Sequence, residues 1–419
     1  MGDLEQPDER SLLRRRPVVG LLAAEVVSTT GAQMTWLALP WFVLVTTGSA
    51  TRMSMVVGAE LIGLALLGIP GGALLRRIGA WRTMLLCDIV RAPLMLAIPV
   101  LHWFGNDAFA PIVVLAFLLG ALAAPFFAAQ KVIVPEILGE DEAIVGRANA
   151  LFQGATRITM LLGPVAGGIL ISVVSAPWAL VVDGCTYVLS AALLLTLVPR
   201  PEPRPQTAED VGARRGIRFL SKEPLLRLWL PLFVLGDTAW TAFFVSVPVL
   251  VVTRYDADPK IAGWLLASFG VGAVLGNAIA YRVLLDRVGG LTLVGTCILG
   301  QALPLWILTL HPEPWLAALS LGLSGIANGL VNPTIHSLMV LRVPAALRPS
   351  VMTVNVMLFG LAQPIGVFGV GPVLDHFGPQ PVLVAFAATQ TVAMSLVALA
   401  SFAVRRRERT TVQAARVAA

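Results

Sequence analysis

Charged side chains are scarce in this sequence. Asp, Glu, Lys and Arg make up 13% of its 419 residues, whereas apolar residues make up 57%. The mean hydropathy is +0.82. Soluble domains carry about 25% charged residues. The composition therefore argues against a soluble globular protein and favours one that is embedded in a membrane.

Cysteines and nucleotide-binding motifs are also scarce. Cys87, Cys185 and Cys297 lie in or beside apolar segments without metal-like spacing, so we expect no disulfide and no metal site. No Gly-x-x-x-x-Gly-Lys-Ser/Thr motif occurs, which argues against an ATP-driven pump of that type. The glycines of 270–276 resemble a dinucleotide loop, but their spacing inside an apolar helix predicts helix packing. We expect no cofactor and, without a nucleophile or an acid–base constellation, no enzymatic activity.

The basic residues are distributed unevenly between alternate loops. Of 30 Lys and Arg residues, we place 25 in the tails and the loops of one side. Arg52, Arg254 and Lys260 fall on the other side, and Arg91 and Arg157 lie within helices. This asymmetry predicts cytoplasmic termini and a multi-pass protein of the inner, or plasma, membrane. The net charge of +6 thus reflects topology, and we expect lipid but no nucleic acid as a partner.

Apolar segments of membrane-spanning length follow one another along the chain. Spanning the hydrocarbon takes about 20 residues of helix. We expect twelve transmembrane helices, near residues 18–45, 53–75, 83–104, 109–130, 147–172, 177–198, 226–252, 261–283, 291–310, 315–340, 349–372 and 380–403. Proline or paired glycine predicts breaks in several of them, at Pro40, Pro70, Gly163-Pro164, Pro248, Pro304, Pro333 and Pro364.

A polar, Pro-rich stretch divides these segments into two sets of six. Such a stretch cannot lie in lipid, so it predicts an aqueous linker between two membrane-embedded halves. The expected organisation is a cytoplasmic tail (1–17), a six-helix bundle (18–198), a cytoplasmic linker (199–225), a second six-helix bundle (226–403) and a cytoplasmic tail (404–419).

The two halves repeat short signals at nearly constant offsets. The run Gly72–Gly79 is echoed 210 residues later by Arg282–Gly289. Gly163-Pro164 is echoed 200 residues later by Gln363-Pro364. Paired signals of this kind predict an internal duplication with both halves in parallel topology.

Two of these motifs carry a resemblance to a known family. Gly72-x-Leu-x-Arg-Arg-x-Gly79, with Asp88-Ile-Val-Arg91 after it, resembles the loop 2–3 signature of the major facilitator superfamily. Gly163-Pro164-x-x-Gly167-Gly168 resembles the antiporter motif in the fifth helix of that superfamily. The run Ala148–Leu151, shortly upstream, resembles the sequence of its macrolide-efflux and enterobactin-exporter branch. The resemblance covers about residues 18–403. One departure is Arg76, which stands where the family has the Asp of a cytoplasmic latch.

The resemblance implies a fold and a set of gating residues. The implied fold is an all-α membrane protein with twelve helices in two pseudo-symmetric six-helix bundles. These bundles would rock about a central site lined mainly by helices one, four, five, seven, ten and eleven. The implied gating residues are Gly72, Arg76, Arg77, Gly79, Asp88, Arg91, Gly163, Pro164, Gly167, Gly168, Asp286, Arg287 and Gly289.

Glu25 is an acidic residue inside the first apolar segment. Gln33 and Trp36 follow it at helical spacing and share its face, which should point to a cavity. Two interpretations are open. Glu25 handles a proton or a cationic substrate, or it is the structural partner of Arg157 in helix five. A buried Arg cannot lose its proton, so we favour the pairing for Arg157 over direct substrate contact.

Asp237 and Glu60 are two further acids at membrane depth. Asp237 lies in helix seven, the equivalent of helix one, so acids on both helices fit a proton-coupling pair. The alternative is that Asp237 caps a helix break or faces an inner vestibule. For Glu60, in helix two, a role in a gate is at least as well supported as one in coupling.

Neutral polar and aromatic side chains are candidates for a substrate cavity. In helix ten, polar residues from Ser320 to His336 recur every fourth residue, a stripe that drifts by about 40° per step, so only part of it can line a cavity. Aromatic side chains suit an apolar or cationic compound, although any one of them can equally be an interfacial anchor or ordinary packing. The candidates are Gln33, Trp36, Trp240, Thr241, Phe244, Asn328, Asn332, Asn355, Phe359 and Gln363.

These features predict a secondary active transporter that exports a small amphipathic compound, such as a drug, a siderophore or a secondary metabolite, by proton antiport. Protons and the substrate are then its partners, and we expect a monomer. An importer or an uncoupled facilitator on the same fold is the alternative. A membrane scaffold or sensor that has lost transport is a further alternative, to which Arg76 gives slight support.

Overall fold

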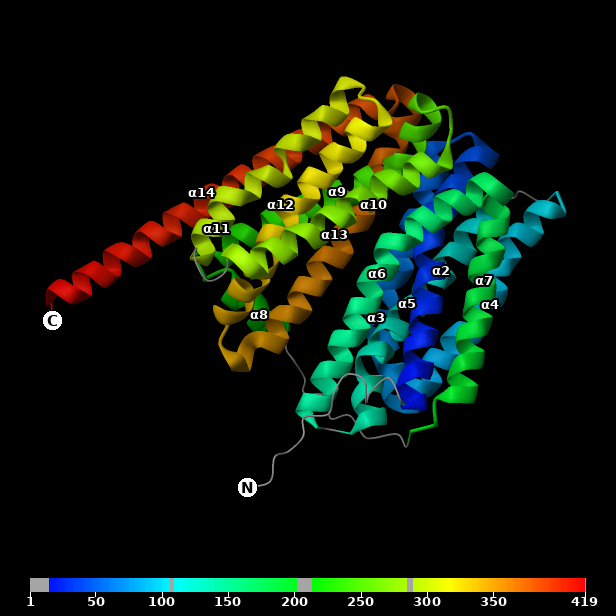
Figure 1. The fold of residues 1–419 in the computed structure, drawn as a ribbon, viewed down its shortest axis with the longest axis horizontal. Helices are drawn as coiled ribbons and strands as arrows, with labels where there is room; N and C mark the ends of the chain where they lie inside the picture. Colours follow the sequence, from blue (N-terminus) through cyan, green and yellow to red (C-terminus); the bar gives the residue numbers. More distant parts are fainter. Residues whose placement is uncertain (1–14, 106–108, 140, 202–212, 285–288, 419) are drawn as a thin grey trace. The chain divides into compact units, whose positions relative to one another are not determined.

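The computed structural model describes residues 15–105, 109–139, 141–201, 213–284 and 289–418. Its regular structure in these ranges is helical (Figure 1). The chain divides into two compact units, residues 1–207 and 208–419, and the dividing line falls inside the polar stretch 199–225. We call them unit 1 and unit 2 and describe each by itself.

Unit 1 is a bundle of six long helices. They are α2 (Arg16–Thr47), α3 (Ala50–Ile78), α4 (Ala80–Trp103), α5 (Phe109–Leu138), α6 (Glu142–Val174) and α7 (Ala176–Leu197). In this unit α2 packs against α6 and α7, and α3 packs against α5.

Unit 2 repeats this plan after a short helix, α8 (Ala213–Leu220). Its longer elements are α9 (Leu226–Arg254), α10 (Pro259–Ile279), α11 (Gly290–Cys297), α12 (Pro314–Leu341), α13 (Arg348–Phe377) and α14 (Pro379–Ala418). A π-helical turn, η1 (Ala280–Leu284), extends α10. Two 3₁₀ segments, η2 (Ile298–Gln301) and η3 (Leu303–Leu310), extend α11, and a third, η4 (Ala345–Leu347), precedes α13.

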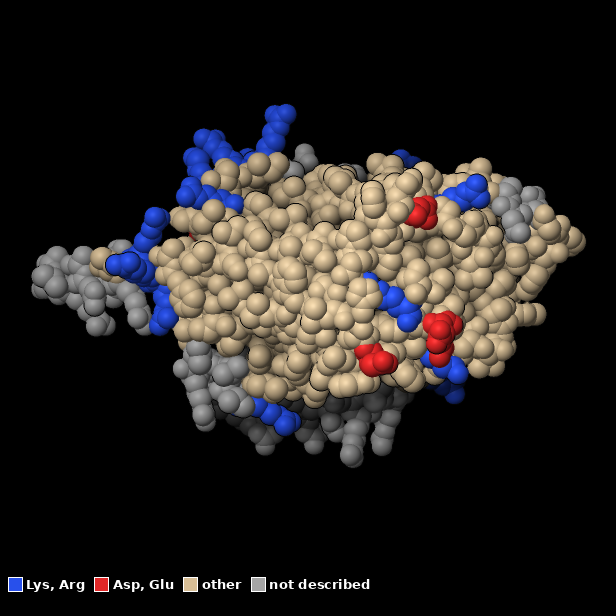
Figure 2. Space-filling model, turned by 90° about the horizontal axis from the view of Figure 1, so that it is seen from above, with Lys and Arg blue, Asp and Glu red and all other residues tan. Residues whose placement is uncertain are grey.

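The helices confirm the expected twelve-helix architecture. Among the described residues, eleven helical segments are long and apolar enough to cross a membrane. The twelfth is α2, which has 32 residues but is more polar because it carries Glu25, Gln33 and several hydroxyl side chains. Figure 2 shows the surface that such helices produce, since wide areas of the face seen there carry neither Lys or Arg nor Asp or Glu.

Proline breaks the helices at far fewer places than the sequence predicts. The helices continue through Pro40, Pro70, Pro164, Pro248, Pro333 and Pro364, so the predicted breaks at these positions are wrong. Only around Pro304 does the segment change to 3₁₀ geometry. There the hydroxyls of Ser320 and Ser324, on α12, donate hydrogen bonds to the carbonyls of Pro304 (2.7 Å) and Gln301 (2.5 Å). These bonds satisfy backbone groups that water cannot reach in a membrane.

Glycines allow equivalent helix pairs to pack closely in the two units. In unit 1, a Cβ at Gly63 or Gly120 would collide with the backbone carbonyl of Phe117 or Glu60, across the α3–α5 contact. In unit 2, a Cβ at Gly272 or Gly276 would collide with the carbonyls of Gly322 and Ile326, across the α10–α12 contact. The glycines of 270–276 therefore serve helix packing, as the sequence predicts.

Some helices run past their apolar segments. Helix α5 ends at Leu138 rather than near 130, and α14 reaches Ala418 rather than 403. The extra turns of α14 contain Arg, Glu, Gln and Ala, which favour helix without needing burial. The residues predicted as a C-terminal tail thus continue α14, which extends beyond the other helices of unit 2 (Figure 1).

Candidate functional site

Glu25 is a buried acid on the first long helix of unit 1. It lies on α2 with 9% of its surface exposed. The hydroxyl of Thr156, on α6, donates a 2.8 Å hydrogen bond to its Oε1 atom. Glu25 thus has a neutral partner from the fifth helix of the same unit.

Arg157 is not the partner of Glu25, which corrects our expectation. Its side chain is exposed, and no described cation forms an ion pair with Glu25. The reason is the phase of α6. Thr156, Gly163 and Gly167 are spaced by seven and four residues and therefore share one face. That face packs on α2, because a Cβ at Gly163 would collide with Gln33 and one at Gly167 would crowd Met34.

Asp237 occupies the equivalent place in unit 2. It lies half-buried on α9, and its Oδ2 atom accepts a 2.8 Å hydrogen bond from the amide nitrogen of Gln363, on α13. On the same turn of α13, Gly366 packs on α9, where a Cβ would meet Thr238. Each unit therefore holds an acid on its first long helix and a neutral donor on its fifth.

Asp237 also borders a pocket that lies wholly within unit 2. Helices α9, α10, α12, α13 and α14 and the 3₁₀ segment η2 enclose a volume of about 480 Å³. Asp237 is the only Asp or Glu among the described lining residues, and none of them is Lys or Arg. Asp237 is thus the group of the described lining that can carry a negative charge.

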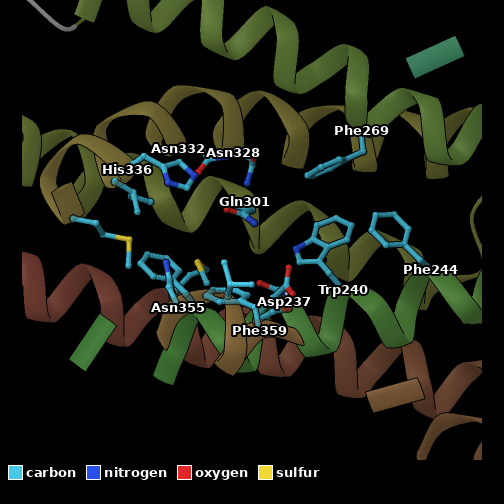
Figure 3. A pocket seen from close by; sticks show the side chains of 17 residues that line it. Asp237, Trp240, Phe244, Phe269, Gln301, Asn328, Asn332, His336, Asn355 and Phe359 are labelled. Carbon is cyan, nitrogen blue, oxygen red and sulfur yellow. Dashed lines mark hydrogen bonds between the residues drawn. The ribbon is translucent and has the colours of Figure 1, made fainter. Parts of the chain in front are cut away.

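The two ends of the pocket differ in chemistry (Figure 3). At one end lie Trp240, Phe244 and Phe269, whose ring centroids are 5.4 Å (Trp240–Phe244) and 4.5 Å (Trp240–Phe269) apart. At the other end lie Asn332, His336 and Asn355, with Asp237 between the two groups. The pocket can therefore receive a molecule with an apolar ring at one end and polar groups at the other.

Several buried polar atoms of the pocket wall lack a partner. Trp240 Nε1, Asn355 Oδ1 and Gln390 Oε1 make no hydrogen bond with the described part of the chain. The other side-chain atom of this last amide, Gln390 Nε2, donates to the carbonyl of Gly236 (2.8 Å) and so fixes its orientation. Because buried polar groups are nearly always paired, these atoms indicate where a ligand or water would bind.

The structure brings most of the predicted cavity residues of unit 2 together. Trp240, Phe244, Asn328, Asn332, Asn355 and Phe359 line the pocket. Gln363 and Thr241 are not among the lining residues, but both contact Asp237. The Gln363 amide donates a hydrogen bond to the Asp237 carboxylate, and the Thr241 hydroxyl donates one to the Asp237 backbone carbonyl (3.0 Å). Gln33 and Trp36 lie on α2 of unit 1 and take no part in this pocket.

Sequence reasoning missed two amides in the pocket wall, Gln301 and Gln390. A signal was present, because each is an isolated amide inside an apolar segment, where polar side chains are costly. The helix-ten stripe divides as predicted: Ser320 and Ser324 bond the backbone near Pro304, while its later members Asn328, Asn332 and His336 line the pocket.

A second set of charged residues is buried in unit 1, away from Glu25. Asp88 and Arg91 of α4 and Asp183 of α7 are at most 4% exposed. The Arg91 guanidinium donates to the hydroxyl of Tyr187 (2.8 Å), while Asp88 accepts from Ser190 (2.6 Å). Asp183 accepts from Thr35 on α2 (2.6 Å) and from Thr186 (3.1 Å). We call Asp88, Arg91 and Asp183 the charged cluster. The loop 2–3 signature suggested a gating role for Asp88 and Arg91, but it did not predict that they would be buried together with Asp183.

Glu60 lies half-buried on α3. Its carboxyl group is close enough to Arg91 and Asp183 of this cluster to interact electrostatically with both. Both roles of Glu60, in a gate and in coupling, stay predictions. Among the described residues, no group of His, Cys, Asp or Glu could hold a metal ion.

The remaining gating residues stay predictions. Gly79 joins α3 to α4 with φ of 82°, a conformation that favours glycine. Gly72, Arg76 and Arg77 lie in the last turns of α3, and both arginines are exposed. Pro164 and Gly168 are buried on α6, and Gly289 precedes α11. Asp286 and Arg287 lie outside the described residues.

Comparison with known proteins agrees with this architecture. The sequence profile of the Major Facilitator Superfamily matches residues 21–258 and 233–418. The multidrug efflux pump Tap of Mycolicibacterium fortuitum is 26% identical over 377 residues, covering 87% of this chain and 91% of Tap. The enterobactin exporter EntS of Salmonella typhi is 31% identical over 232 residues, covering 50% of this chain and 53% of EntS.

A solved structure supports the fold independently of sequence. The crystal structure of the nucleoside transporter NupG aligns with a TM-score of 0.72 at 13% identity, covering 92% of this chain and 98% of NupG. At this identity the likeness concerns the fold alone. Because the family profile spans nearly the whole chain and the twelve-helix fold agrees with it, the chain belongs to the major facilitator superfamily and is a multi-pass membrane transporter.

Proposed function

We propose that the protein exports small amphipathic compounds in exchange for protons. The observation that carries this proposal is the matched pair of acids. Glu25 accepts its hydrogen bond from Thr156, and Asp237 accepts from Gln363, so in each unit the acid lies on the first long helix and its neutral donor on the fifth. The relatedness to a multidrug efflux pump and to an enterobactin exporter supports the direction of transport.

The neutral partners make both acids suitable proton carriers. A carboxylate that pairs with a cation must break the pair before it can be protonated, at the cost of leaving a buried charge. Neither Glu25 nor Asp237 pairs with a described cation, so protonation removes a charge without exposing another. Holding a charge at membrane depth is costly, which favours exchange of that charge for a proton or a cationic substrate.

The pocket of unit 2 supports the substrate class. Its aromatic end suits a flat apolar ring, its amides suit hydrogen-bonding groups, and Asp237 suits a cation. Drugs, siderophores and secondary metabolites all include compounds of this type. A pH gradient drives the exchange, and each net charge that crosses adds about 2.3 kcal/mol per 100 mV of membrane potential.

We further propose an inner, or plasma, membrane location with both termini in the cytoplasm, and a monomer as the working unit. The asymmetry of Lys and Arg supports the orientation. A reporter enzyme that is active only in the cytoplasm, fused after Ala419, should be active. An inactive fusion would reverse the proposed topology.

Transport into sealed inverted vesicles tests the mechanism. With an inward-acid pH gradient, a fluorescent amphipathic cation should accumulate, and an uncoupler should abolish this accumulation. We expect Glu25→Gln and Asp237→Asn each to lose gradient-driven accumulation, because neither amide can carry a proton. Asp256→Asn, at an exposed position between α9 and α10, is the matched control and should behave as the wild type.

Each other outcome has a definite meaning. Full gradient-driven accumulation in both variants would exclude these acids as proton carriers. If the wild type accumulates the compound equally with and without the pH gradient, the protein is a facilitator. Gradient-driven uptake that occurs only in right-side-out vesicles would indicate an importer.

A further inference from the structure

Unit 2 has a second hollow, which the proposed transport cycle does not use. It is a groove of about 430 Å³ between α8, the start of α9 and the first half of α13. Ile217, Leu230, Val354 and Leu358 contribute to its wall, which is apolar apart from Ser221 and Arg227. We call it the α8 groove.

The α8 groove has a fixed wall, because α8 is seated on α13. A Cβ at Gly216 would lie 2.5 Å from the carbonyl oxygen of Ser350 and 3.1 Å from the nitrogen of Val351. Leu220, one turn later, is only 6% exposed and packs with Val351 and Val354. The amphipathic α8 thus has a buried edge that closes the groove on one side.

One rim of the groove is cationic. Arg227 lines it, and the exposed Arg218 and Lys222 directly follow the lining residues Ile217 and Ser221 in the sequence. Glu223 is the only acid in the described stretch 213–231. It already binds Arg342 (3.1 Å) and the backbone N–H of Leu226 (2.5 Å). Among the described residues, Arg218, Lys222 and Arg227 form no ion pair with an acid.

The groove lies where a membrane surface must be. Helix α9 is a candidate membrane span that begins at Leu226, so Arg227 stands at the boundary between hydrocarbon and headgroups. Leu358 and Leu361, on the α13 side, are 40% and 60% exposed. An apolar channel that ends at basic side chains at this depth matches the two parts of an anionic phospholipid.

We propose that the α8 groove binds one anionic phospholipid, with an acyl chain between α8 and α13 and its phosphate on Arg227, Arg218 and Lys222. The site also touches the transport machinery. Val354 and Leu358 alternate along α13 with Asn355 and Phe359, which line the substrate pocket. A bound lipid thus packs on the helix that also positions Gln363 against Asp237.

Native mass spectrometry of the purified full-length protein tests this site. The protein is incubated with dioleoyl phosphatidylglycerol or with dioleoyl phosphatidylcholine, and the lipid adducts are counted. We expect one phosphatidylglycerol to be retained in preference to phosphatidylcholine. Arg227→Gln should weaken its retention about fivefold, the expected effect of one basic residue at an anionic surface.

Two further variants separate the groove from general charge attraction. Leu358→Trp fills the groove but keeps every cation, and should lower retention of phosphatidylglycerol. Arg405→Gln removes a cation of α14 that does not line the groove, and should retain the lipid as the wild type does.

Three results would overturn the proposal. The first is equal retention of the two lipids by the wild type. The second is wild-type retention by Arg227→Gln, which replaces an exposed side chain, or by a folded Leu358→Trp. The third is a lipid-free dimer, which would make a second copy of the chain the occupant.

Discussion

The same helix positions are used differently in the two units. In unit 1, Arg91 of α4 is buried against Tyr187, near Asp88 and Asp183. The offset of 210 residues that relates Gly79 to Gly289 leads from Arg91 to Gln301, which lines the pocket of unit 2. Unit 1 thus fills this region with charged and aromatic side chains, whereas unit 2 leaves it open.

This difference indicates that the two units contribute differently to the protein. A buried ion cluster holds helices in one arrangement, because any shift exposes an unpaired charge to a medium of low dielectric constant. A wall of neutral amides carries no such penalty and tolerates different occupants. Both units keep the acid on the first helix, so the shared feature is the one that the proton-coupling proposal needs.

The largest expected effect comes from removing the cation of unit 1. Arg91→Met leaves the buried acids Asp88 and Asp183 without a counter-ion, and should cost about 3–5 kcal/mol in the free energy of unfolding. The matched change in unit 2, Gln301→Met, should cost less than about 1.5 kcal/mol, because it conserves volume at a cavity wall. Denaturant unfolding of the purified variants measures both. Equal losses would contradict the contrast between the units.

A smaller effect is expected from opening the aromatic end of the pocket. Trp240→Ala removes a ring that contacts Phe244 and Phe269, and should raise the KM for a cationic aromatic substrate about five- to thirtyfold. Trp178→Ala in unit 1 is the matched control, since Trp178 is 49% exposed and lines no part of this pocket. An unchanged KM for Trp240→Ala would remove the pocket from the transport route.

The smallest expected difference is the one between two serines, one from each unit. Ser190 donates to the Asp88 carboxylate, and Ser324 donates to the neutral carbonyl of Gln301. Hydrogen bonds to charged groups contribute about 1.5–3 kcal/mol, and neutral ones about 0.5–1.5. Ser190→Ala should therefore lower the unfolding midpoint more than Ser324→Ala. The reverse order would argue that Asp88 is not ionised in the folded protein.

The sequence predicts the helices well because their apolar lengths and their glycines are local signals. It fails at Arg157 because Thr156 and Arg157 are adjacent, and only the rotation of α6 on α2 decides which of them meets Glu25. The face shared by Gly163 and Gly167 contains this information, but its use requires knowing that α2 is the neighbour. The charged cluster is harder still, since it joins α2, α4 and α7 over more than 100 residues of chain.

Under the proposed function, the amides of the unit 2 pocket have a consequence for substrate recognition. A primary amide presents an acceptor or a donor according to the rotation of its last torsion. Gln301, Asn328 and Asn332 can each turn in this way, while Gln390 is held by the Gly236 carbonyl. The pocket wall can therefore reverse its hydrogen-bonding polarity, group by group, without moving a helix. A protein with such a wall can accept chemically unrelated compounds from a single rigid backbone, and its selectivity then depends more on shape and charge than on any fixed pattern of donors.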